Sequence, residues 1–363
     1  MTSLRTILSF LRFPARNHTG SFAARSSTRY TLATNFAVSR KILRANHATQ
    51  PALTIQQTNM TNNAQFSDFR FKLEYYGLRT VIGLVRALPL ETATAISAKI
   101  WSTLAPLLNP KRHQRALDNL RIAFPDKSED ELDKIRRRHW ENLGRVMAET
   151  MQIDRIVCDP SRMTIKPAAM FQRYRSKLGS AVGISLHMGN WELAIWPLAH
   201  AGANPAAIYR SVTNPYVDQY LRDQRKDLYP GGLFGRGKVG DHGDDRKTAR
   251  VITDYVRKGG RLGMVCDLYD RTGIPIDFFG KPAKTQAIGA MIARRVGARI
   301  WLSRCKRIGT SSRFEIELRE LRVPRTSNQS NDVHWVMEEM QRVFEEWIRE
   351  TPEQWMWSNR RWS

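Results

Sequence analysis

Beyond about residue 180, short apolar runs alternate with longer segments in which apolar residues recur every three or four positions. The short runs predict buried β-strands, and the longer segments predict helices that pack by one face. Strands are expected at 181–186, 206–210, 262–266, 299–304 and 314–321, and helices at 191–200, 216–228, 247–257, 287–296 and 332–348. Because strands that alternate with helices form a sheet covered by those helices, the pattern predicts an α/β fold. Its central sheet is expected to be mostly parallel and flanked by helices.

Residues 70–108 show a different pattern, in which apolar blocks are interrupted by single charges. Arg79 and Arg86 are seven residues apart and share one helical face, while apolar residues cover much of the rest. No uninterrupted run approaches the roughly 20 apolar residues of a spanning helix. The segment is either a set of helices packed on the protein's own core or an anchor on a membrane surface. The fold prediction takes the second interpretation, an N-terminal helical membrane-associating region.

Another helix is predicted to begin just after Pro125. Ser128 and Glu131 have the spacing of a capping box, in which each side chain bonds the other residue's backbone N–H. The buried stripe of this helix is expected to consist of Leu132, Ile135, Leu143 and Met147.

The first 67 residues contain no Asp or Glu and eight Lys or Arg, and they are rich in Ser, Thr and Ala. Such a composition resembles an organellar transit peptide. The alternative, which we favour, is an over-extended reading frame whose true start is Met60. The leader supplies +8 of the net charge of +24, so +16 belongs to residues 68–363, which are expected to form a single domain. This charge predicts an anionic partner: nucleic acid, lipid headgroups or an acidic protein.

The amino-acid composition indicates a globular protein. Hydrophobic residues make up 42% of the chain and charged residues 25%, which is typical of a globular protein. A mean hydropathy of -0.47 argues against several membrane spans. Cys158, Cys266 and Cys305 are far apart and form no C-x-x-C motif, so we expect reduced thiols and no metal site.

The candidate chemistry centres on "ISLHMGNWELAI", residues 184–195. On one continuous helix His187 and Glu192 would lie about 140° apart and could not meet. They can meet if His187 lies on a strand-to-helix turn at Gly189, with Asn190 as the N-cap and Glu192 in the first helical turn. The carboxylate would then orient an imidazole that acts as a base, and the helix N-terminus would offer N–H groups to developing negative charge. The alternative is a buried histidine satisfied by a neighbouring acid.

Other catalytic motifs are absent from the sequence. Neither G-x-S-x-G nor H-E-x-x-H occurs, so direct transfer to a substrate hydroxyl is more natural than covalent catalysis. "GLFGRGKV" has the frame of a phosphate loop, but Val239 stands where Ser or Thr should bind magnesium. We therefore exclude nucleotide hydrolysis, although this segment could contact an anion.

Four ordered blocks carry a family resemblance: "LHMGNWELA", "YRSVTNPYVDQYLRDQR", "GMVCDLYDRTGIPIDFFGKPAKTQAIGAMIARRVGA" and "PEQWMWSNRRW". The first looks like the H-x-x-x-x-[DE] block of glycerolipid-type acyltransferases. Together they resemble the late acyltransferases of lipid A biosynthesis, the lauroyl/myristoyl transferase family. The resemblance runs from about Phe71 to Trp362, nearly all of the chain beyond the leader.

The resemblance implies roles for individual residues. It makes His187 the catalytic base and Glu192 its partner. Arg225 matches an arginine that steadies the transition state or the donor. Asp267 matches an acid in a substrate-binding block, although Leu268 follows where the family has Gln. The wall of the acyl or acceptor pocket would include Phe278, Phe279, Gly280 and Thr285; plain core packing is the alternative for the two phenylalanines.

The implied activity is an O-acyltransferase without metal or cofactor. It would transfer a lauroyl-type chain from acyl-acyl carrier protein to a hydroxyl of a 3-hydroxyacyl chain on a Kdo-bearing lipid A precursor. The expected location is the cytoplasmic face of a bacterial inner membrane, and the +16 body suits an anionic membrane surface as well as an acidic carrier protein.

Two rival functions remain at this stage. One is an acyltransferase that uses acyl-CoA and acts on another glycolipid or a lysophospholipid. The other is a basic nucleic-acid-binding protein, but the sequence lacks the recognition motifs of that class, so no nucleic-acid partner is expected.

Overall fold

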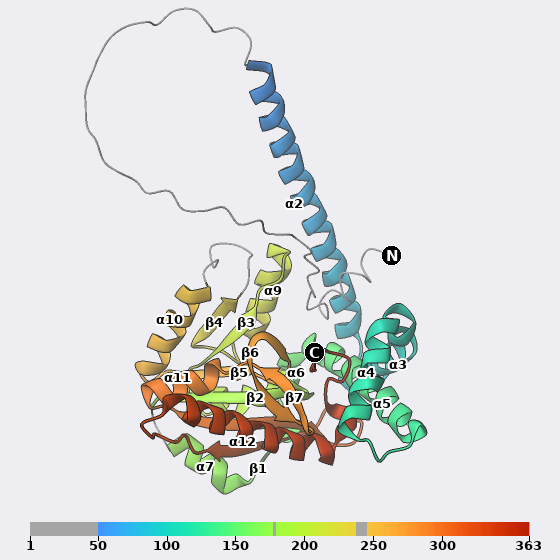
Figure 1. Ribbon diagram of the computed structural model, residues 1–363. Helices are drawn as coiled ribbons and strands as arrows, with labels where there is room; N and C mark the ends of the chain where they lie inside the picture. The colour runs from blue at the N-terminus through green and yellow to red at the C-terminus, as the bar shows by residue number, and fades with distance from the viewer. Residues whose placement is uncertain (1–49, 177–178, 237–244, 363) are drawn as a thin grey trace, which may run out of the picture. The chain divides into compact units, whose positions relative to one another are not determined.

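The computed structural model describes residues 50–176, 179–236 and 245–362 (Figure 1). Residues 1–49, most of the acid-free leader, lie outside this part, as does Val239 of the "GLFGRGKV" segment. The chain divides into two units, Met1–Thr80 and Val81–Ser363. In the first unit the described residues belong to helix α2 (Gln50–Ala87), which continues into the second unit.

Four more helices precede the sheet: α3 (Leu90–Leu108), α4 (Pro110–Ala123), α5 (Glu129–Thr150) and α6 (Ile153–Val157). The capping box predicted at Ser128 and Glu131 is confirmed at the start of α5. Helices α3 and α5 approach closely at Gly144, where a Cβ would lie 2.6 Å from the carbonyl oxygen of Ser97. Ser97 Oγ also donates to the Gly144 carbonyl oxygen at 2.6 Å. Only glycine permits this backbone approach.

A seven-stranded sheet forms the centre of the second unit, with strand order β1-β9-β8-β2-β5-β3-β4. Its strands are β1 (Met163–Lys166), β2 (Ala181–Gly189), β3 (Pro205–Arg210), β4 (Gly232–Arg236), β5 (Arg261–Val265), β8 (Arg299–Arg307) and β9 (Phe314–Leu321). Every pairing is parallel except β8 with β9, so the predicted mostly parallel sheet is confirmed. A separate antiparallel hairpin, β6 (Tyr269–Phe278) and β7 (Lys281–Thr285), was not predicted, and neither were β1 and β4.

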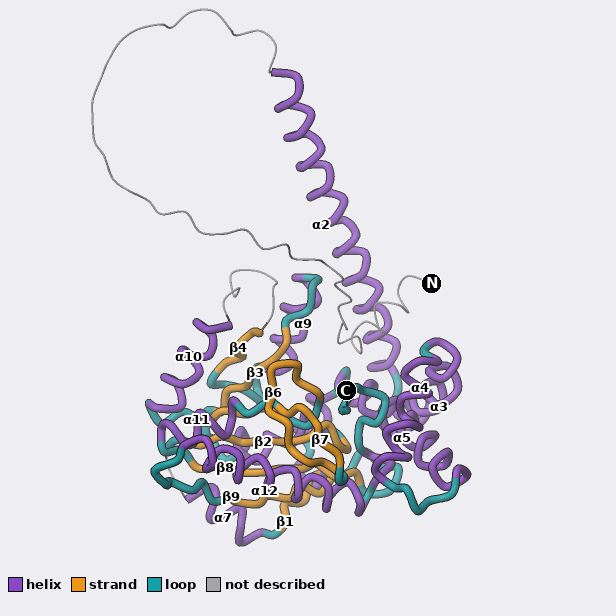
Figure 2. Tube along the Cα trace, in the orientation of Figure 1, coloured by secondary structure: helices purple, strands orange, loops and turns teal. Residues whose placement is uncertain are grey.

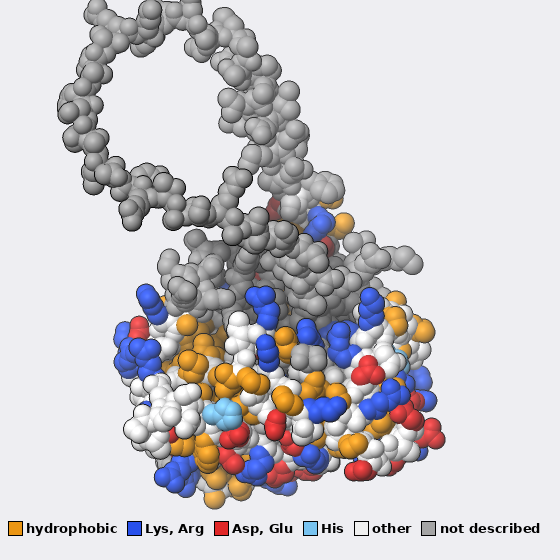
Figure 3. Space-filling model, viewed as in Figure 1, with side chains coloured by type: hydrophobic (Ala, Val, Ile, Leu, Met, Phe, Trp, Pro, Cys, Tyr) orange, Lys and Arg blue, Asp and Glu red, His pale blue; other side chains and the backbone are white. Residues whose placement is uncertain are grey.

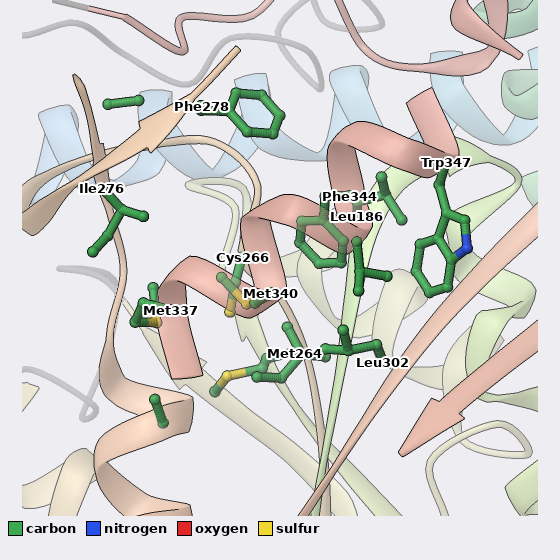
Figure 4. Close-up of a cluster of buried hydrophobic side chains, with 14 of the residues drawn as sticks. Leu186, Met264, Cys266, Ile276, Phe278, Leu302, Met337, Met340, Phe344 and Trp347 are labelled. Carbon is green, nitrogen blue, oxygen red and sulfur yellow. The ribbon is translucent and has the colours of Figure 1, made fainter. Parts of the chain in front are cut away.

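Helices α10 (Asp245–Arg257), α11 (Ile288–Val296) and α12 (Gln329–Glu350) cover one face of this sheet (Figures 1 and 2). Leu186, Met264 and Leu302, from three neighbouring strands, face an apolar stripe of α12 (Figure 4). That stripe consists of Met337, Met340, Phe344 and Trp347. The predicted helices 247–257, 287–296 and 332–348 therefore lie close to where the sequence placed them.

The opposite face packs against the short helices η2 (Trp191–Ile195) and α8 (Trp196–His200), which share a second core with residues of β8 and β9. The predicted helix 191–200 is thus a 3-10 turn followed by a short α-helix. Helix α9 (Pro215–Arg225) follows β3, and α7 (Ala168–Ser176) follows β1. Between α5 and β1 lies the turn η1 (Pro160–Arg162), and after α12 comes η3 (Pro352–Gln354), from which the chain runs to its C-terminus.

No helix in the described ranges is both long and apolar enough to cross a bilayer. Helix α3 nevertheless carries an exposed apolar stripe, made of Ile96, Ile100, Leu104, Leu107 and Leu108. Ile96, Ile100, Leu104 and Leu108 are four residues apart and Leu107 is three residues after Leu104, so they share one helical face. On the face of the molecule shown in Figure 3, Lys and Arg side chains are spread among apolar ones.

Candidate active site

His187 and Asp267 are brought together by the register of two neighbouring parallel strands. Ser185 of β2 pairs with Val265, the last residue of β5, so His187 of β2 and Asp267, two residues beyond β5, come close together. His187 is still within β2, which extends to Gly189 and not only to the predicted 186. Side chains alternate along a strand, so Gly183, Ser185 and His187 point to the same face of the sheet.

The two side chains form a tight pair. His187 Nδ1 lies 2.7 Å from Asp267 Oδ1, and the backbone N–H of His187 donates to Oδ2 at 2.8 Å. Burial would raise the pKa of the Asp267 carboxyl, but the His187 imidazole and the hydrogen bonds hold the pKa below its usual value. An ionised carboxylate accepts only, so Nδ1 carries the proton and Nε2 presents its lone pair. Within the described residues nothing hydrogen-bonds Nε2, and the His187 side chain retains 14% exposure.

The C-terminal segment supplies a third donor to this carboxylate. Trp355 Nε1 donates to Asp267 Oδ2 at 2.7 Å. Asp267 has no exposed surface. A buried carboxylate needs hydrogen-bond donors, and both of its oxygens accept here. Trp355 is a site residue that the sequence did not single out; the signal available was its place in the "PEQWMWSNRRW" block.

The structure gives no hydrogen bond between Glu192 and His187, although the charge of His187 helps to lower the pKa of Glu192. Glu192 accepts two hydrogen bonds from Arg225 of α9, at 2.8 Å from Nε and 2.6 Å from Nη2. Burial would raise the pKa of Glu192, but the Arg225 guanidinium holds it below the usual range. A bidentate guanidinium–carboxylate pair is among the strongest charge-assisted contacts, and the imidazole already has Asp267 beside it. Glu192 does lie in the first turn of η2, as predicted, but the imidazole hydrogen-bonds Asp267.

The turn after His187 is fixed by close contacts. Gly189 has φ +58°, and a Cβ there would lie 1.7 Å from the carbonyl oxygen of Cys305, so the glycine is sterically required. Asn190 occupies the N-cap position but makes no side-chain cap, which corrects that prediction. Its Nδ2 donates instead to Glu149 Oε2 at 2.9 Å.

Glu149 belongs to a buried polar network that sequence reasoning missed. Arg307 Nη2 donates to Glu149 Oε2 at 2.8 Å, and Ser312 Oγ donates to Oε1 at 2.8 Å. Asn142 links Arg307 to the turn, because it accepts from Arg307 Nε at 3.0 Å and its Nδ2 lies 3.3 Å from the Gly189 carbonyl oxygen. Asn142 and Glu149 lie on α5, whereas Arg307 and Ser312 lie in the β8–β9 region. Glu149 and Arg307 are 158 residues apart in the sequence, and no sequence motif joins them.

The β6–β7 hairpin carries Phe278, Phe279, Gly280 and Thr285, and the Phe278 ring packs against Trp355. The rings of Phe278 and Phe279 are 4.9 Å apart and both side chains are buried in the main core, as the core-packing alternative supposed. Gly280 is exposed at the turn with φ +69°. Thr285 is buried and its Oγ1 accepts from Arg361 Nη2 at 2.8 Å. A role for these four residues in substrate binding stays a prediction.

A small, largely apolar pocket, with a cavity volume of about 60 Å³ and partly open to solvent, lies on the His187 face of the sheet. Gly183, Gly263 and Ala207 form its floor on three strands, and residues 191–198 of η2 and α8 form much of its wall. The Trp191 ring, which lines the pocket, meets the His187 ring edge-on at 5.2 Å. Tyr229 lines it too; burial and the charge of Glu192 raise the Tyr229 pKa above its usual value. His187 and Glu192 do not line the pocket, but its lining residues Trp191 and Tyr229 are their neighbours.

The arrangement is suited to removing a proton from a hydroxyl group beside an apolar chain. A search of curated proteins found no match to the chain. A family model described as bacterial lipid A biosynthesis acyltransferase matches residues 64–363. With this match over most of its length, the chain belongs to the bacterial lipid A biosynthesis acyltransferase family and is an acyltransferase.

Proposed function

We propose that the protein is an O-acyltransferase that moves a lauroyl-type chain from acyl-acyl carrier protein to a hydroxyl of a 3-hydroxyacyl chain on a Kdo-bearing lipid A precursor. The observation that carries this proposal is the 2.7 Å contact between His187 Nδ1 and Asp267 Oδ1, which leaves Nε2 as the basic atom. Family membership supports the lipid A precursor as acceptor. The carrier-bound donor and the chain length are the finer parts of the proposal.

The reaction proceeds in one transfer. His187 Nε2 takes the proton of the acceptor hydroxyl while its oxygen attacks the carbonyl carbon of the thioester. The carbon–sulfur bond then breaks, the ester remains on the acceptor, and His187 returns the proton to the departing thiolate. Asp267 stabilises the imidazolium that forms between these steps and holds its tautomer.

The apolar pocket holds the acyl chain in this proposal. Its cavity volume is about 60 Å³, so it takes part of the chain, and its floor is built from small residues on three strands. The Glu192–Arg225 pair lies close enough to His187 for the charges to interact, so its guanidinium can steady the donor or the developing negative charge.

We place the protein on the cytoplasmic face of a bacterial inner membrane. The exposed stripe of α3, from Ile96 to Leu108, is suited to shallow insertion at a bilayer surface. The net charge of +24, of which +16 lies beyond the leader, suits anionic headgroups, an anionic acceptor and an acidic carrier protein.

The decisive experiment combines a deletion strain with a purified-protein assay. Lipid A from the deletion strain should lack one acyl chain by mass spectrometry, and the chain should return with the wild-type gene but not with His187→Ala. Lauroyl-carrier protein should support transfer in the purified assay, and lauroyl-CoA with a lysophospholipid should not. An unchanged lipid A spectrum, or a fully active His187→Ala protein, would remove the proposal.

A further inference from the structure

The C-terminal segment holds the His187–Asp267 pair from two directions. Trp355 donates its indole Nε1–H to Asp267 Oδ2 at 2.7 Å. The next residue, Met356, donates its backbone N–H to the carbonyl oxygen of His187 at 3.1 Å. Trp355 also forms an antiparallel β-bridge with Met188. One dipeptide therefore contacts both the Asp267 carboxylate and the main chain at His187 and Met188.

The indole of Trp355 is itself immobilised. It has no exposed surface, and its ring packs edge-on against Phe278 at 5.7 Å and Trp357 at 4.6 Å. Its backbone carbonyl accepts from His139 Nδ1 at 2.9 Å. A donor fixed in this way can set the orientation of the group that it contacts, because neither partner has room to rotate.

The two carboxylate oxygens of Asp267 accept hydrogen bonds from different donors. Oδ2 accepts from the His187 backbone N–H at 2.8 Å and from Trp355 at 2.7 Å, whereas Oδ1 meets the imidazole. We propose that Trp355 is a positioning residue, whose indole N–H holds the Asp267 carboxylate so that Oδ1 faces His187 Nδ1. This inference rests on the proposed function, in which His187 is the base.

The hydrogen bond from Trp355 also helps to lower the pKa of the Asp267 carboxyl. The charged groups that face Asp267 are His187 on β2 and Arg361 of the C-terminal segment, whose guanidinium lies 4.6 Å from the Phe278 ring centre. An N–H bond to a carboxylate is stronger when no imidazolium compensates the negative charge. Removal of the Trp355 donor should therefore strengthen the attraction of the Asp267 carboxylate for a proton or a neighbouring cation.

Trp357 offers a matched control. Trp355 and Trp357 are both fully buried, lie in the same segment and donate one indole hydrogen bond each, but Trp357 Nε1 donates to the Pro352 carbonyl oxygen at 2.6 Å. Trp355→Phe and Trp357→Phe each keep an aromatic ring and remove one donor. Both variants should lower Tm, whereas only Trp355→Phe should disturb the His187–Asp267 pair.

In full-length protein we expect Trp355→Phe to lower kcat about 10-fold, the effect of losing one hydrogen bond to a charged group, with KM nearly unchanged. The acid limb of its pH profile should move to higher pH, on the order of half a unit, because the neutral-imidazole state loses its donor. Trp357→Phe should keep the wild-type profile. Equal losses of kcat with unshifted profiles in both variants would overturn the inference.

A measurement without turnover separates this inference from the proposed function. With histidine-labelled protein, and His187→Ala to assign the signal, NMR follows the titration of the His187 ring. A raised pKa of this imidazole in Trp355→Phe, but not in Trp357→Phe, supports positioning whether or not His187 proves catalytic. An unmoved pKa in both variants overturns positioning and leaves the acyltransferase proposal standing.

Discussion

His187 and Asp267 are eighty residues apart in the sequence, yet they meet because His187 lies in β2 and Asp267 follows the end of the adjacent parallel strand β5 by two residues. The carboxyl ends of both strands reach the same edge of the sheet, so a base on β2 meets a carboxylate just beyond β5 without any local motif. The contact at 2.7 Å is therefore a property of strand register. A shift of β2 by one residue would turn the His187 side chain to the opposite face.

Asp267→Asn should lower kcat by roughly 1,000-fold with little change in KM. The amide can present an N–H to Nδ1, which favours the tautomer that lacks a lone pair on Nε2, and it cannot stabilise an imidazolium. Steady-state transfer from lauroyl-carrier protein measures the effect. Asp270→Asn, three residues along the chain on β6, is the control and should stay close to wild type. A loss of less than 10-fold for Asp267→Asn would contradict the assignment.

The sheet and most of its covering helices could be predicted because period-2 and period-3.6 patterns are local properties of the chain. The pairing partner of His187 could not be predicted in the same way. Glu192 is near in sequence and was assigned to the imidazole, whereas Asp267 reaches it through strand order, which hydrophobic patterning does not specify. The Glu149–Arg307 ion pair was missed for the same reason, since its partners come from α5 and β8. Local patterns reveal elements, and contacts between elements need the topology.

Glu192→Gln should destabilise the protein more than the double change Glu192→Gln with Arg225→Gln. The single change leaves a largely buried guanidinium without its counter-ion, at a cost of about 3 kcal/mol, whereas the double change removes both charges. Urea unfolding of wild type, both single variants and the double variant gives the four free energies of unfolding of a double-mutant cycle. Strictly additive free energies of unfolding would show that the two side chains do not interact.

Gly189→Ala should lower the free energy of unfolding by at least about 3 kcal/mol, because the new Cβ meets the Cys305 carbonyl oxygen in a left-handed backbone conformation. Gly202→Ala is the matched control. Gly202 also has a positive φ, +73°, but a Cβ there has no atom within 4 Å. It should therefore cost only the backbone strain, about 1–2 kcal/mol. Similar losses in both variants would mean that the turn at Gly189 can relax.

Gly183→Val should shorten the acyl chain that the enzyme prefers. Gly183 lies on the pocket floor, and the contact that its Cβ would make within 4 Å is an ordinary one of 3.7 Å with the Leu262 carbonyl oxygen. A valine therefore fits the strand and fills pocket volume. Competition among carrier-bound acyl donors of graded length measures the preference. Ile184→Val, on the other face of β2, should leave it unchanged, and an unshifted preference in Gly183→Val would place the acyl chain elsewhere.

Ile100→Lys combined with Leu104→Lys should weaken binding to lipid vesicles while leaving the fold and the chemistry intact. Both side chains lie in the exposed apolar stripe of α3, so a charge there costs no core packing but opposes burial in the headgroup region. Flotation with vesicles of neutral lipid isolates the apolar contribution, because added lysines would strengthen attraction to anionic ones. Met291→Lys, an exposed apolar position on α11, is the control and should float like wild type. Activity on detergent-dispersed acceptor should be retained in all variants. Unchanged flotation of the double variant would mean that α3 does not contact the bilayer, and its apolar stripe would then need another partner.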